Sequence, residues 1–131
     1  MNVASIRADL VEVCPSMYVK HAYVPETVKA FPAVIANPPR VVEYRATLGL
    51  CRLEIALTVV ASSATIEDAQ ARLDAALSTD GPESVLAAIE GVLSTEWETA
   101  LVMSIDNVRA VKDGAQTAMS VDIILEIFSK R

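Results

Sequence analysis

The feature that most constrains the fold is a pair of adjoining β-strand patterns in the middle of the chain. Residues 51–60 place apolar side chains at every second position, which gives the strand one apolar face made of Leu53, Ile55, Leu57 and Val59. Residues 41–48 alternate in the same way, and Gly49 separates the two runs, a pattern typical of a β-hairpin. We therefore expect both strands to bury one face.

A second hairpin is predicted near the C-terminal end. Apolar residues alternate along 101–111 and again along 119–127, and Asp113-Gly114 between them is a strong local turn signal. Ile124 and Phe128 add apolar groups to the second face of the last run. That strand is therefore expected to lie in the centre of a sheet.

Three segments have the periodicity of helices. Residues 3–14 repeat apolar side chains every three to four positions, after a suitable N-cap at Asn2 and before Pro15. Residues 65–79 begin with Thr65 and Asp68 in a capping-box-like arrangement. Pro82 suits the first turn of a third helix, over about residues 82–93.

Two weaker strand patterns, at 18–24 and 31–36, lie in a stretch interrupted by prolines, which confine strands to sheet edges or strand ends. The predicted order is α-β-β-β-β-α-α-β-β. It indicates an α+β fold, with a single mixed or antiparallel sheet and helices packed on one face. A chain of 131 residues fits one domain, residues 1–131.

Composition excludes several classes of function. Hydrophobic residues make up 53% of the chain and charged residues 21%, which argues against disorder. The formal charge of −6 leaves no basic surface for a dedicated nucleic-acid-binding role. No apolar stretch reaches the roughly 18–20 residues that span a bilayer, and the first residues lack a signal-peptide pattern, so we expect a soluble chain.

Candidate reactive groups are few. His21 is the sole histidine, and the cysteines Cys14 and Cys51 lie among apolar neighbours. A Cys–His nucleophile pair is conceivable, but buried reduced thiols are the simpler interpretation. Neither metal-ligand spacings nor a glycine-rich phosphate loop is present. We expect no catalytic, cofactor or metal site, and hence not an enzyme.

The residues that favour protein contacts lie in two places. The segment 37–45 joins a stiff proline pair to alternating charges and one tyrosine, and arginine and tyrosine are enriched at interfaces. It is also consistent with an ordinary loop that leads into a strand. Trp97, between two glutamates, is either a core residue or a partly exposed contact. The candidate contact residues are Pro38, Pro39, Arg40, Glu43, Tyr44, Arg45 and Trp97.

The order of elements and several packing motifs resemble the tail-terminator, or tail-completion, subunits of long-tailed bacteriophages, a family of minor tail and head–tail joining proteins. The resemblance covers about residues 3–128. The residues that carry it are Pro32-Ala33-Val34, Pro38, Glu43-Tyr44, Ala69-Gln70-Ala71-Arg72-Leu73-Asp74, Ser84-Val85 and Ala88-Ile89-Glu90.

The resemblance implies a structural virion protein. Such subunits form a ring, usually of six copies, that caps the tail tube, terminates tail polymerisation and presents a joining surface to the head connector. The implied partners are other copies of the chain, the tail-tube protein and the connector or neck protein. DNA only passes through the lumen, and no membrane is involved. The implied location is the tail–neck junction of the virion, and the host cytoplasm during assembly.

Other functions remain open at this stage. A neck or head-completion protein that contacts the portal would have a similar size and composition. A small cellular α+β domain that binds a ligand or acts as an enzyme is a different class, and the missing site residues and few aromatics argue against it. A regulatory or immunity-type protein that binds one partner is a further alternative.

Overall fold

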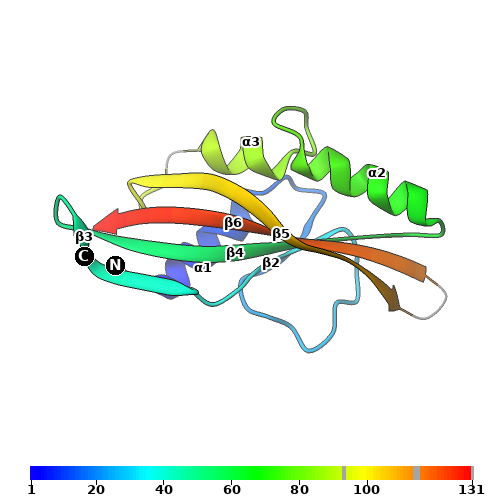
Figure 1. Cartoon of the computed structure of the whole chain (residues 1–131), viewed down its shortest axis with the longest axis horizontal. Coiled ribbons are helices and arrows are strands. Elements are labelled where there is room, and N and C mark those ends of the chain that lie inside the picture. The colour runs from blue at the N-terminus through cyan, green and yellow to red at the C-terminus, as the bar shows by residue number, and fades with distance from the viewer. Residues whose placement is uncertain (93, 114–115, 131) are drawn as a thin grey trace.

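The computed structural model describes residues 1–92, 94–113 and 116–130 and consists of one sheet with helices beside it (Figure 1). The elements are α1 Val3–Glu12, β1 Val19–His21, β2 Ala33–Ala36, β3 Val41–Thr47, β4 Leu50–Ser63, α2 Ile66–Leu77, α3 Val85–Glu90, β5 Thr99–Asp113 and β6 Gln116–Lys130. Their order is the predicted one, and the α+β class is confirmed.

The sheet is mixed and has the order β1-β2-β4-β6-β5. β1 and β2 are parallel, and the other neighbours are antiparallel. β6 pairs with β4 from one end to the other, so β3 and β2 share the opposite edge of β4. The prediction of a central last strand is confirmed, because β6 lies between β4 and β5. Gly114 of the predicted Asp113-Gly114 turn lies outside the described residues.

The main core lies between the sheet and the helices. The alternation predicted for residues 51–60 is confirmed, since Leu53, Ile55, Leu57 and Val59 are fully buried. Equivalent positions of β6 and the apolar stripes of α1, α2 and α3 belong to the same core cluster. All three helices therefore cover one face of the sheet, as predicted (Figure 1). Burial of each large aliphatic side chain stabilises the fold by about 1.5–3 kcal/mol.

Side chains cap the starts of the helices. Asn2 accepts a hydrogen bond from the Ser5 N–H at 3.0 Å, and Thr65 accepts one from the Asp68 N–H at 3.2 Å, as the sequence predicts. α1 ends at Glu12, so Cys14 follows the helix.

The third helix is shorter than predicted. The Ser84 hydroxyl accepts from the Ala87 N–H at 3.0 Å, which makes Ser84 the N-cap and leaves Pro82 before the helix. Its last turn closes where the Gly91 N–H donates to the Ala87 carbonyl.

The strand predictions at 18–24 and 31–36 correspond to the shorter strands β1 and β2, and β2 lies inside the sheet. The expectation that residues 41–48 bury one face is wrong. Tyr44 and Leu48 are exposed, and no residue of β3 belongs to the core cluster, because the helices cover β4 and β6 and leave β3 uncovered.

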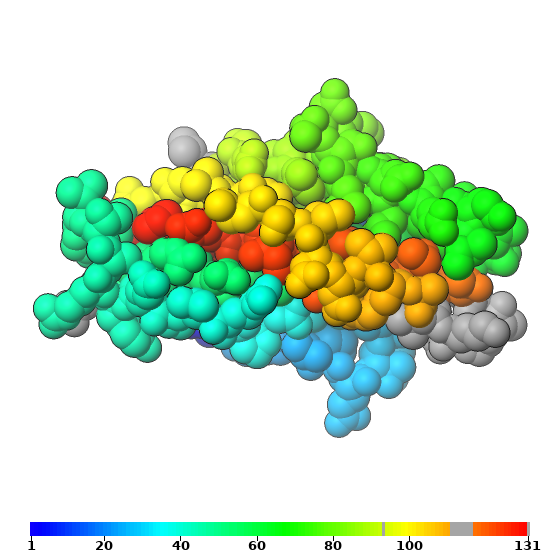
Figure 2. Space-filling model, viewed as in Figure 1, coloured from blue at the N-terminus to red at the C-terminus, as the bar shows by residue number. Residues whose placement is uncertain are grey.

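The other face of the sheet is only partly covered. Val28 and Phe31, from the chain between β1 and β2, pack on a small cluster of Ile35, Val60 and Ala118. Figure 2 shows that β4 and β6 are open to the surface between β3 and β5. The sheet thus has two free edges, with β5 at one side and β1 and β3 at the other.

Candidate subunit interface

The two predicted reactive cysteines are buried, and each thiol donates a hydrogen bond to a backbone carbonyl. The Cys14 thiol donates to the Leu10 carbonyl at 3.3 Å, and burial raises its pKa to about 12, so it is protonated at neutral pH. The Cys51 thiol donates to the Tyr44 carbonyl at 3.4 Å. Within residues 1–92, 94–113 and 116–130, His, Cys, Asp and Glu side chains form no group of three that would hold a metal ion. None of the helices in this part of the chain is long and apolar enough to cross a membrane.

Six of the predicted contact residues lie together, on the approach to β3 and on β3 itself. Pro38 and Arg40 are exposed and Pro39 is half-buried before the strand begins. The Arg40 N–H donates to the Glu54 carbonyl at 2.7 Å, and its guanidinium lies 3.7 Å from the Glu54 carboxylate. These bonds fix the point at which the segment joins the sheet and leave its outer side free.

β3 carries two charged side chains, Glu43 and Arg45, which differ in their surroundings. Glu43 forms an ion pair with Arg52 at 3.3 Å, whereas Tyr44 and Arg45 are exposed. The register with β4 shifts between Glu43 and Thr47, so the strand is irregular where Tyr44 and Arg45 lie. Among the described residues, Arg45 has no carboxylate partner.

Trp97, the seventh predicted contact residue, lies apart from the others. Its side chain is only 6% exposed and belongs to the main core cluster. Of the two interpretations of this residue, burial supports the core role. We therefore leave Trp97 out of the exposed contact surface.

The open face of the sheet carries a network of ion pairs. The Arg52 guanidinium lies 2.9 Å from the Glu126 carboxylate, 3.3 Å from that of Glu43 and 3.6 Å from that of Glu54, so it joins three strands. Farther along, the Thr58 hydroxyl donates to the Asp122 carboxylate at 2.7 Å. Because these charges are already paired within the chain, the open face is weakly suited to apolar contacts.

The sequence did not indicate that the edge strand β5 would be exposed. Leu101, Met103, Ile105 and Val108 are between 43% and 56% exposed. The first three nevertheless occupy every second position, as in a half-buried strand. The strand has register shifts between Val102 and Ser104 and between Asp106 and Arg109, the second at Asn107, whose φ is +57°. Such bulges are common at sheet edges, where they disrupt flat strand pairing.

The tip of the β3–β4 hairpin exposes another large apolar side chain. Leu48 is 94% exposed, and both Leu48 and Gly49 have positive φ, at +50° and +75°. A two-residue turn with two positive φ angles favours Asn-Gly, so leucine is an unusual residue at its first position.

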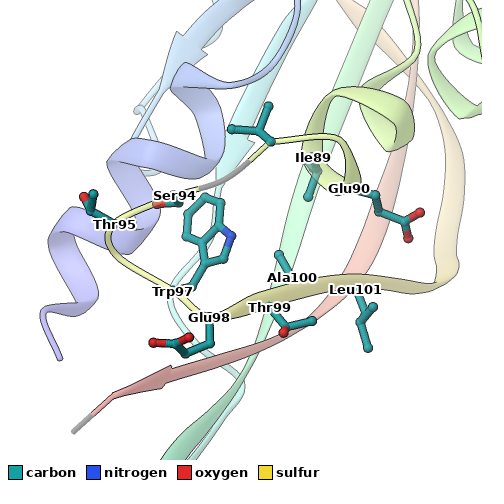
Figure 3. Close-up of a pocket in the computed structure, with 10 residues that line it drawn as sticks. Ile89, Glu90, Ser94, Thr95, Trp97, Glu98, Thr99, Ala100 and Leu101 are labelled. Atoms are coloured by element: carbon teal, nitrogen blue, oxygen red, sulfur yellow. The ribbon is translucent and has the colours of Figure 1, made fainter.

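A cavity of about 660 Å³ lies beside the start of β5 (Figure 3). The Trp97 indole lies between the end of α3, which carries Ile89 and Glu90, and the part of β5 that carries Ala100. The Glu90 carboxylate accepts a hydrogen bond from the Val102 N–H at 3.1 Å and so connects α3 to β5. The lining mixes apolar side chains with the hydroxyl groups of Ser94, Thr95 and Thr99, and Glu90 and Glu98 add acidic groups to it.

Comparison with solved structures shows a likeness in fold. No protein-family model and no curated protein sequence matches the chain. A chain of the solved structure titled "Virion of native gene transfer agent (GTA) particle" matches with a TM-score of 0.55, over 97% of this chain and 86% of that chain. The two share a fold. At 20% sequence identity the likeness extends to the arrangement of helices and strands and no further.

Proposed function

We propose that the chain is a structural virion subunit that forms a ring on the end of a phage-type tail tube. The ring stops tail polymerisation and provides the joining surface for the head connector. The observation that carries the proposal is the fold that this chain shares with a virion chain. In this chain, both free edges of the sheet present exposed apolar side chains. Exposed apolar groups on strand edges favour association.

The proposed partners follow from this role. Copies of the chain contact one another in a ring of six, one side of the ring binds tail-tube protein, and the other side binds the connector. The exposed segment with Pro38, Pro39, Arg40, Glu43, Tyr44 and Arg45 is the proposed contact surface. The assembly is located at the tail–neck junction, after it has formed in the host cytoplasm.

DNA passes through such a ring without binding to it. The formal charge of −6 per chain repels the phosphate backbone. The cations Arg40, Arg52 and Arg109 on the open sheet face each lie near a carboxylate, which lowers their attraction for phosphate.

The test is co-assembly with the tail-tube protein from the same genome. Tube protein polymerises in the presence and absence of the chain, and electron microscopy records tube length and the structure of the tube ends. We expect shorter tubes with a ring at one end. Tubes of unchanged length, together with binding of the chain to purified portal rings, would support the neck or head-completion role instead.

A further inference from the structure

The unusual hairpin tip and the cavity beside β5 lie on opposite edges of the same sheet. Leu48 precedes β4, on the edge formed by β3, whereas the cavity borders β5. We propose that Leu48 of one copy inserts into the cavity of the next copy, and that this head-to-tail contact joins the copies of the ring. The inference deepens the proposed function and rests on it only for the closure of the ring.

The first argument is the conformation of Leu48. Its side chain is 94% exposed, so it gains almost no burial within its own chain. The turn would be more stable with asparagine, which adopts positive φ more readily than leucine does. A residue that is unfavourable in its turn and unburied in the monomer fits a contact made outside the monomer.

The second argument is that the cavity matches the tip in chemical character. Val92 and Leu101 are exposed in the lining and provide apolar contacts for a leucine side chain. At the rim, the Glu90 carboxylate has no cation partner among the described residues, and on the hairpin Arg45 has no carboxylate partner. An acidic rim and a basic, apolar tip are complementary in charge.

The third argument is position along the strands. Leu50, directly after the tip, pairs with Lys130, and Thr99 at the cavity pairs with Phe128, so tip and cavity lie at the same end of the sheet. They are separated across the sheet by three strand spacings, about 14 Å. A ring relates its copies by rotation without translation along its axis. Two contact surfaces at the same end of the sheet and on opposite edges suit an axis that runs along the strands.

The volume of the cavity also falls within the range of about 300–1,000 Å³ that is typical of small-molecule sites. A small molecule is therefore the competing occupant. A small molecule would fill the cavity but would leave the 94% exposure of Leu48 unexplained. The hairpin tip of a second copy accounts for both the cavity and the exposed Leu48 side chain.

The test uses two variants, each of which removes one side of the contact. Leu48→Asn removes the tip side chain and suits the positive φ, so it leaves the monomer at least as stable as the wild type. Val92→Lys places a cation at the mouth of the cavity, where Val92 is partly exposed. Matched controls are Met17→Asn and Val24→Lys, which change exposed apolar residues away from both surfaces.

Sedimentation velocity at increasing protein concentration measures self-association. We expect the wild type and both controls to associate, and each contact variant alone to associate about 10- to 100-fold more weakly, as loss of one buried leucine predicts. An equimolar mixture of the two variants retains one intact tip and one intact cavity per pair. It should form a 1:1 dimer and nothing larger.

Three results would overturn the inference. They are a wild-type chain that is monomeric at millimolar concentration, a Leu48→Asn chain that associates like the wild type, and a mixture that stays monomeric under conditions in which the wild type assembles. The tube-length assay separates this failure from failure of the proposed function. Leu48→Asn rings that still cap tubes contradict only the inference, whereas wild-type rings that form through this contact without shortening tubes contradict only the function.

Discussion

Two groups that lose a proton at alkaline pH, Cys14 and Tyr18, are buried in the main core and make the fold sensitive to alkaline pH. Burial raises the pKa of the Cys14 thiol from 9.0 to about 12. Burial, followed by the nearby Glu83, raises the pKa of Tyr18 from 10.0 to about 12. The Tyr18 hydroxyl donates to the Glu83 carbonyl at 2.8 Å, which requires its protonated form. Both groups therefore ionise more readily in the unfolded chain than in the folded one.

The sign of the pH dependence follows. The contribution of each group to stability is complete below the pKa of the unfolded chain and is lost as pH rises from about 9 towards 12, at up to about 1.4 kcal/mol per pH unit for each group. We expect the free energy of unfolding, measured by urea titration, to fall over this range. In Cys14→Ala the stability at pH 7 is lower, and the fall between pH 9 and 10 is shallower. A fall parallel to that of the wild type would show that Cys14 does not contribute.

Among the elements, α3 is short, and a buried side chain caps its start. Ser84 is 2% exposed, caps the helix through the Ala87 N–H and also donates its hydroxyl to the Ser78 carbonyl. A helix of six residues gains little from its own hydrogen bonds and depends on its cap and its packing. Since α3 carries Ile89 and Glu90, the cap also positions one wall of the cavity.

We expect Ser84→Ala to lower the free energy of unfolding by about 1–2 kcal/mol, through loss of the cap and of a buried hydrogen bond. The control is Ser78→Ala on the exposed end of α2, which should change stability by less than about 0.5 kcal/mol. Urea unfolding followed by circular dichroism gives both values, with an unchanged m-value if the effect is on stability alone. Equal effects of the two substitutions would mean that Ser84 does not hold the helix.

The elements also show which parts of the fold local sequence can determine. Strand β4 was predictable because residues 51–60 repeat with a period of two and have partners on both sides, so each apolar position is buried. β3 and β5 repeat with the same period, yet they lie at edges, where the pattern alone does not indicate which positions a neighbour covers. The burial of Trp97 between two glutamates had no local signal, because it depends on packing in the main core, beside Ile89 of α3. The leucine before Gly49 was a usable signal, since that turn favours asparagine.

At the scale of the whole molecule, the charged and apolar groups are separated. The helices bury one face of the sheet, ion pairs occupy the open face, and exposed apolar side chains gather on the two edges. A domain with this distribution adds neighbours sideways, edge to edge, and keeps its broad faces solvated. Repetition of one sideways contact produces a ring when the rotation between copies closes, and a filament when it does not.

In the proposed ring, the edge formed by β3 contributes to assembly and little to folding. Tyr44 is 61% exposed, and the side chain of Arg40 is about half exposed, so neither contributes much to the core. We expect Tyr44→Ala and Arg40→Glu to leave the urea midpoint of the monomer unchanged and to weaken self-association and tube capping by about tenfold or more, as interface tyrosine and arginine residues do. Tyr23→Ala is the matched control, since Tyr23 is also 61% exposed but follows β1 and lies against the Arg7 guanidinium. Unfolding of Tyr44→Ala would assign this residue to the fold, and equal assembly of the two tyrosine variants would remove the β3 edge from the ring contact.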